Sequence, residues 1–188
     1  MMFPRAHQPS GKLVLVLFFV TNAVFSLMLI YSIPKLMSYA SGLEIFDMSP
    51  TGYNYEMAVA LLNGLGEEGR AFYYRHLMLD TLYPALFAVC YYLLFHWVAN
   101  KSQLQSNGWL WLSALPLLSA LFDYLENIGI YAMLQSYPDL SANLVEMTSW
   151  FTVVKSMSAT LYWFALLTVA AVGLVKWLKK RRVATAGG

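Results

Sequence analysis

The sequence predicts an all-α membrane protein, a four-transmembrane-helix, up-down-up-down bundle with a partly helical first extracytoplasmic loop. Of its 188 residues, 59% are hydrophobic and 12% are charged, whereas an average soluble domain carries about 25% charged residues. Four apolar runs are long enough to cross a bilayer, which takes about 20 residues. The charges are also sorted by position, with basic residues at the C-terminal end and most acids in two loops. We therefore treat residues 1–188 as one integral membrane domain.

The four predicted spans are residues 13–33, 77–98, 109–134 and 150–178. The middle of each span is apolar on every side, a pattern typical of lipid contact or deep burial. The first span follows basic residues, as a signal peptide does. Its apolar core is longer than the roughly 7–15 residues usual for a signal peptide, and no small-residue cleavage site follows it. We therefore expect it to remain as the first membrane helix.

The connections differ in length. Short loops join the second span to the third and the third to the fourth, which predicts antiparallel neighbours in a bundle. The first outer loop, residues 34–76, is long for a connection. Within it, residues 47–52 predict a turn and a helix start, and residues 55–62 predict a short helix that Gly64 and Gly66 end. This segment is either an interfacial helix resting on the bilayer or a lid over an outward-facing pocket.

The distribution of basic residues predicts the orientation. With four crossings both termini share one side, and the loops and ends on that side hold basic residues without any acid: Arg5, Lys12, Lys101, Lys176, Lys179, Lys180, Arg181 and Arg182. The positive-inside rule then places both termini in the cytoplasm, with a basic tail at residues 179–188. The compact layout favours a bacterial inner membrane. For the basic tail, anionic lipid is a more natural partner than nucleic acid, because it follows directly on a membrane helix.

Four charged residues lie inside the apolar runs: Asp80, Asp123, Glu126 and Lys155. One ionised side chain at the centre of a bilayer costs about 2.5–3.5 kcal/mol on insertion scales. All four lie at similar depth in the outer half of the predicted bundle, within a slab of about 10 Å. We therefore expect Lys155 to form a salt bridge with at least one acid. Three acids and one lysine also require bound protons or a cation, because burial disfavours excess charge.

Polar neighbours share helical faces with these four charges and are candidate ligand-binding residues. Pro84 leaves the carbonyl of Asp80 without its helical partner, so we expect a kink in that helix. Two arginines lie near the predicted outer mouth. The candidates are His76, Tyr83, Asn127, Thr152, Ser156, Arg70 and Arg75.

The motifs that the chain lacks narrow its chemistry. It has a single cysteine, Cys90, and no His-x3-His or His-Glu zinc motif, so we expect no metal site. It also has no glycine-rich phosphate loop and no G-x-S-x-G nucleophile motif. We therefore expect no cofactor.

The leading hypothesis is an outer-leaflet-facing ionisable pocket that binds a lipid or small amphiphile and processes it by acid–base chemistry. Asp80 with Asp123 or Glu126 would transfer protons, and Lys155 would be the stabilising cation. One alternative is proton- or cation-coupled transport, for which so small a chain would form a homodimer. Another is a non-catalytic subunit or assembly factor of a membrane complex. A purely structural polar core, without any site, is the remaining alternative.

Overall fold

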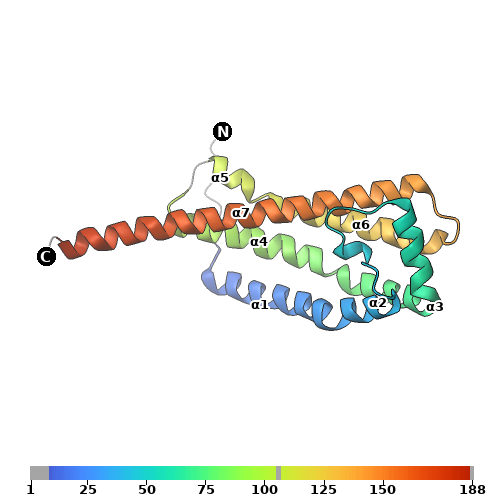
Figure 1. The fold of residues 1–188 in the computed structure, drawn as a ribbon. Helices are drawn as coiled ribbons and strands as arrows, with labels where there is room; N and C mark the ends of the chain where they lie inside the picture. The colour runs from blue at the N-terminus through green and yellow to red at the C-terminus, as the bar shows by residue number, and fades with distance from the viewer. Residues whose placement is uncertain (1–8, 105–106, 187–188) are drawn as a thin grey trace.

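The computed structural model describes residues 9–104 and 107–186, and all regular secondary structure in these residues is helical (Figure 1). Four helices of the described part are long and apolar enough to cross a membrane, which indicates an integral membrane protein. Their bounds are Gly11–Tyr39, Tyr55–Lys101, Leu115–Ser136 and Ala142–Arg182. The predicted class, an all-α protein with four such helices, is confirmed at this level. Arg5, one of the basic residues used to predict the orientation, lies outside the described residues.

The first span is longer than predicted. It consists of α1 (Gly11–Leu27), a π-helical turn (Met28–Ser32) and α2 (Ile33–Tyr39), without interruption. Pro34 stands in the first turn of α2. Proline has no N–H to donate, and the wider π turn before it lets the helix pass this residue. The helix therefore continues to Tyr39, and the loop expected from residue 34 begins after it.

The segment between α2 and α3, residues 40–54, folds back into the protein. It holds a short 3-10 helix, Phe46–Met48, and its buried side chains include Ile45 and Phe46. Gly42 and Gly52 have φ values of 88° and 85°, in the left-handed region where glycine is favoured. The predicted turn is therefore present, but the next helix is capped later, at Asn54, whose side chain accepts a hydrogen bond from the Met57 amide at 2.8 Å.

Helix α3 (Tyr55–Asp80) contains one interruption, at Gly66, where φ is 61° and ψ is −171°. Gly64 remains helical, so only the second of the two predicted stop residues acts as one. Arg70 Nη1 donates a hydrogen bond to the Leu62 carbonyl at 2.8 Å, across this interruption. Beyond Gly66 the chain is helical as far as Asp80. Most of the predicted outer loop, residues 34–76, is therefore helix.

The kink expected beside Pro84 is present. Helix α3 ends at Asp80, and α4 (Tyr83–Lys101) starts after a turn. The Tyr124 hydroxyl donates to the Thr81 carbonyl in this turn at 3.0 Å. A side chain of the third membrane-spanning helix thus ties this turn to its neighbour.

The third predicted span, residues 109–134, is wrong as a single helix. The structure has α5 (Asn107–Leu112), a turn, and then α6 (Leu115–Ser136). Pro116 lies in the first turn of α6, where a missing N–H does no harm, and a helix running into it from Trp109 would lose a hydrogen bond. The fourth span is longer than residues 150–178, because α7 (Ala142–Ala186) includes most of the predicted basic tail.

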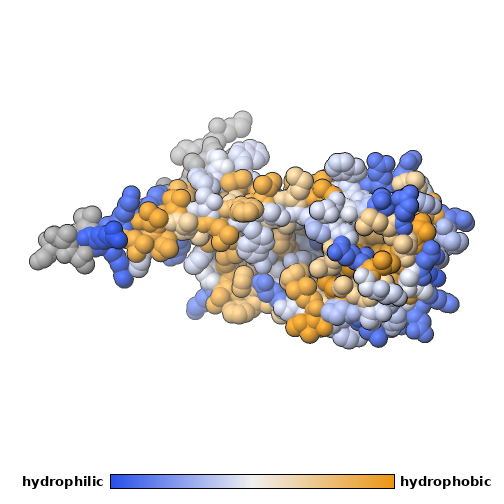
Figure 2. Space-filling view, in the orientation of Figure 1, coloured by the Kyte–Doolittle hydropathy of each residue, from blue (hydrophilic) through white to orange (hydrophobic). Residues whose placement is uncertain are grey.

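Helices α6 and α7 pack closely where Gly129 has no side chain. A Cβ atom on Gly129 of α6 would overlap the Thr148 side chain of α7. In Figure 1 the α6–α7 loop and α3 lie at one end of the molecule, and the C-terminal part of α7 extends past the other helices at the opposite end. Hydrophilic residues gather at these two ends in Figure 2, and hydrophobic residues cover much of the surface between them.

Candidate functional site

Polar side chains from three helices and the 3-10 helix meet inside the bundle. Most of them are buried; Glu126 and Thr152 are 0% exposed. On α7 they lie between Val145, in one apolar core, and Tyr162, in another. We call this group the polar cluster, and it consists of Asp47, His76, Asp80, Asp123, Glu126, Asn127, Thr152 and Lys155.

Local helix geometry explains how α6 contributes three polar residues to one place. Asp123, Glu126 and Asn127 stand at i, i+3 and i+4 and therefore share one face. All three are buried. On α7, Thr152 and Lys155 are three residues apart and also share a face. The close approach at Gly129 brings these two polar faces together.

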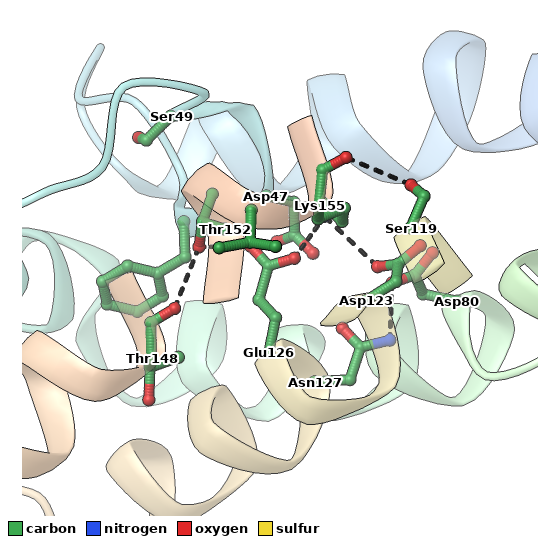
Figure 3. A network of polar contacts seen from close by, with 12 residues as sticks. Asp47, Ser49, Asp80, Ser119, Asp123, Glu126, Asn127, Thr148, Thr152 and Lys155 are labelled. Atoms are coloured by element: carbon green, nitrogen blue, oxygen red, sulfur yellow. Dashed lines mark hydrogen bonds and ion pairs between the residues drawn. The ribbon is translucent and has the colours of Figure 1, made fainter. Parts of the chain in front are cut away.

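Lys155 is the cation at the centre of the cluster (Figure 3). Its Nζ lies 3.2 Å from Asp123 Oδ1 and forms a second ion pair with Glu126 Oε2. The Lys155 side chain is 16% exposed. Its backbone carbonyl accepts a hydrogen bond from the Ser119 hydroxyl at 3.1 Å, which ties α7 to α6 a second time. The expected salt bridge between Lys155 and an acid is therefore present, with two acids.

The other carboxylates have different partners. Glu126 Oε1 accepts a hydrogen bond from the Thr152 hydroxyl at 2.7 Å. Asp80, at the end of α3, accepts one from Asn127 Nδ2 at 2.8 Å. Glu126 is thus held by a cation and a hydroxyl, whereas Asp80 has a neutral amide as its hydrogen-bond partner. The two carboxyl groups therefore lie in unlike electrostatic surroundings.

Asp47 is the member of the cluster that the sequence analysis missed. The 3-10 helix brings it to His76, whose Nε2 lies 3.8 Å from Asp47 Oδ1. The Tyr73 hydroxyl donates to Asp47 Oδ2 at 2.5 Å. Burial alone would raise the pKa of Asp47, but His76, the Lys155 charge and the Tyr73 hydrogen bond outweigh it and hold this pKa well below its usual value. Asp47 is therefore an ionised fourth acid of the cluster.

The structure brings some sequence candidates into the cluster and leaves others outside it. His76, Asn127 and Thr152 belong to it, and His76 Nδ1 also lies 2.5 Å from Ser32 Oγ. Four candidates do not share its hydrogen bonds or ion pairs. Arg70 packs over the Tyr137 ring, Arg75 is exposed, Tyr83 stacks on Phe25, and Ser156 is half-buried on α7.

Unpaired polar atoms concentrate at the same place. Among the described residues, the buried side-chain atoms without a hydrogen-bond partner are Asp47 Oδ1, Tyr53 Oη, His76 Nε2, Glu126 Oε2 and Asn127 Oδ1. Of these, Glu126 Oε2 has the ion pair with Lys155, and Asp47 Oδ1 and His76 Nε2 lie 3.8 Å from each other. Buried polar atoms are nearly always hydrogen-bonded, so this part of the bundle differs from the apolar cores on either side of it.

Tyr53 borders the cluster from the 40–54 segment. Its hydroxyl faces Thr152, whose own hydroxyl donates to Glu126, and Tyr53 Oη is one of the buried atoms without a hydrogen bond. Burial and the negative charge of Glu126 raise the pKa of Tyr53. The hydroxyl therefore keeps its hydrogen and can donate it to a bound group.

A groove opens on the other side of Tyr53. Its volume is about 440 Å³, and its lining includes Tyr53, Glu146, Ser149 and Trp150. The Tyr53 amide donates to Ser149 Oγ at 2.8 Å, which joins the two walls. Tyr53 therefore separates this groove from the polar cluster.

In the part of the chain that the structure describes, no group of three or more His, Cys, Asp or Glu residues could hold a metal ion. The chemistry of the cluster is that of carboxylates, one amine, one imidazole and hydroxyl groups. Such groups can give and accept protons and can stabilise charge. Comparison with known proteins adds no family: no family model, no curated protein and no solved structure matches this chain.

Proposed function

We propose that this integral membrane protein binds the polar part of a lipid or small amphiphile at the polar cluster and exchanges protons with it. One observation carries the proposal: the buried polar atoms without a hydrogen bond in the described residues are all in the cluster or beside it, and two of them, Tyr53 Oη and Asn127 Oδ1, have no ion pair to compensate. The cluster also has four carboxylates for one lysine and one histidine. A group with spare donors and acceptors would satisfy these atoms.

Acid–base chemistry is the reaction type that these residues support. Asp80 and Asp123 or Glu126 form the proton-transfer pair, and Lys155 stabilises negative charge that develops nearby. The unlike surroundings of Asp80 and Glu126 suit this division, because one carboxyl can keep a proton while the other stays ionised. An isomerisation or a hydrolysis would need no further type of group.

The membrane arrangement that fits this function is an up-down-up-down bundle with both termini in the cytoplasm of a bacterial cell. Gly11 lies against Trp97, and Lys176 Nζ is 3.3 Å from the carbonyls of Ser102 and Gln103, so the start of α1, the end of α4 and the late part of α7 share one end. That end carries the basic residues, which favours the cytoplasmic side. The cluster would then open towards the outer leaflet.

The acidic side chains face the interior of the bundle, which favours a binding site over the role of an assembly factor. A partner subunit would call for acids on the outside of the bundle. Asp80, Asp123 and Glu126 are instead 3%, 7% and 0% exposed and point inward. Proton- or cation-coupled transport by a homodimer would use the same residues, and a proton-flux measurement in liposomes separates it from amphiphile binding.

The experiment compares wild type with Asp80→Asn, which keeps the shape of the side chain and leaves the Lys155 pairs intact. Both proteins are extracted from expression membranes into nanodiscs, and the retained amphiphiles are identified by mass spectrometry. We expect wild type to retain one class that Asp80→Asn loses. The control is Lys176→Met, at the far end of α7. Identical retained sets in wild type and Asp80→Asn, with both proteins folded, would contradict the proposal.

A further inference from the structure

Two neighbouring hollows lie beside the polar cluster, and they share residues. The first, of about 440 Å³, is the groove next to Tyr53. The second, of about 320 Å³, is lined by α7 residues that include Met147 and Phe151. Glu146 and Trp150 line both hollows, which are therefore neighbours along α7.

The two hollows differ in chemistry. The first is lined by polar residues, among them Thr51, Asn54 and Ser149, together with apolar ones such as Met57 and Val153. The second is mostly apolar, through Met147, Trp150 and Phe151. A partly polar hollow beside an apolar one suits an amphiphile, with its head group in the first and the start of its chain in the second.

Glu146 is the charged residue that lines either hollow. It stands four residues before Trp150 on α7, so the carboxylate and the indole lie on the same helical face. Both side chains are exposed, and Trp150 is 61% exposed. A carboxylate beside an accessible indole face is a pair that binds ammonium groups, through charge and through cation–π attraction.

We propose that this groove seats the head group of a bilayer amphiphile that carries a quaternary or primary ammonium, held by Glu146 and Trp150. The inference rests on the proposed function and narrows its ligand class. The segments around the groove are acidic overall, which suits a cationic group: residues 34–76 and 136–146 hold seven acids and three basic residues. Of those three, Arg70 packs over the Tyr137 ring and donates to the Leu62 carbonyl, away from the groove.

Tyr53 connects such a head group to the polar cluster. It lines the groove, and its hydroxyl faces Thr152 and Glu126. An amphiphile anchored at Glu146 therefore has its polar part next to the wall that borders the candidate acid–base residues. The groove would hold the ammonium end of the amphiphile, and the polar cluster would contact the rest of its polar part.

The test uses protein in a neutral maltoside detergent, titrated with short-chain phosphatidylcholine and with phosphatidylglycerol of the same chain length. Bound lipid is counted by native mass spectrometry. We expect wild type to prefer phosphatidylcholine. Glu146→Gln and Trp150→Leu should each weaken its binding by about two- to fivefold, the range of an exposed cation–π contact. Glu56→Gln, an exposed acid that does not line the groove, should leave binding unchanged.

Each outcome has a separate meaning. Equal or stronger binding of phosphatidylglycerol, or no change in Glu146→Gln, overturns the head-group assignment. If Asp80→Asn still loses its retained amphiphile in that case, the proposed function stands without this assignment. If wild type binds no amphiphile in either experiment, both proposals fail.

Discussion

Lys155 shares one positive charge between two buried carboxylates, Asp123 and Glu126. Removal of one partner of a buried pair is more damaging than removal of both, because the remaining charge is left without compensation. We expect Lys155→Met to lower the free energy of unfolding by about 3–5 kcal/mol. Adding Glu126→Gln should recover part of this loss, as measured by thermal unfolding in detergent.

The matched control for this comparison is Lys176→Met, which removes a lysine that contacts only backbone carbonyls. A double variant less stable than Lys155→Met would argue against charge compensation. The same double variant separates two roles of the cluster. A purely structural core predicts that folding and ligand retention return together, whereas a site predicts that folding returns without ligand retention.

The ionisation of Asp47 makes the stability of the folded protein depend on pH. Its folded pKa lies below the unfolded value of about 3.9, so its contribution to stability is complete above that value. The contribution is lost as pH falls towards the folded pKa. We expect the melting temperature of wild type to fall more steeply between about pH 5 and pH 3 than that of Asp47→Asn. Asp139→Asn, in an exposed loop, should keep the wild-type slope. Parallel slopes in wild type and Asp47→Asn would refute this role.

The sequence reveals some members of the cluster and hides others for a physical reason. Asp80, Asp123, Glu126 and Lys155 could be found because an isolated charge within an apolar run is costly and needs a partner. Asp47 could not, because it stands in a polar segment where a charge is ordinary. Only the return of residues 40–54 into the bundle buries it. The sequence also does not give the direction of a long side chain. Arg70 was a candidate ligand-binding residue, but it packs over the Tyr137 ring.

At the scale of helices, neither proline nor glycine alone predicted where the chain breaks. Pro84 marks the break after Asp80, and Pro116 explains the turn between α5 and α6, although we predicted one continuous span there. Gly64 stays helical, because glycine permits a break without requiring one. Pro34 is passed by a π-helical turn. Proline and glycine thus mark positions where a helix can break, and packing with the rest of the protein decides at which of them it does.

The contact between α6 and α7 depends on the lack of a side chain at Gly129. A Cβ atom there would overlap Thr148, so Gly129→Ala must push the helices apart. We expect a loss of about 1–3 kcal/mol in the free energy of unfolding, typical of overpacking. Gly108→Ala, at a helical glycine with open space around it, is the control. Equal stability of the two variants would show that α6 and α7 tolerate a wider spacing.

At the scale of the whole molecule, the four spans were predictable, because hydropathy and length alone identify helices that can cross a bilayer. The extent of α7 was not. Its 45 residues correspond to about 67 Å, more than twice the roughly 30 Å hydrocarbon core of a bilayer. We predicted a basic tail at residues 179–188, after the last membrane helix, yet the helix continues as far as Ala186.

The proposed topology is tested by cysteine labelling in a Cys90→Ala background, which removes the one native thiol. Single cysteines replace Ser136, at the end of α6, and Gly188, at the C-terminus. We expect a membrane-impermeant maleimide added to intact cells to label position 136 and to reach position 188 only after lysis. Labelling of both positions from outside would contradict cytoplasmic termini.

The ties between α6 and α7 have a mechanical consequence. Lys155 with its two acids, Ser119 with the Lys155 carbonyl, and Thr152 with Glu126 all join these helices within about two turns. A slide of one helical turn, about 5.4 Å, would break all of them at once. The α6–α7 pair therefore acts as a fixed frame. Any opening that admits a ligand is then expected in α1, α2 and residues 40–54, which lie outside that frame.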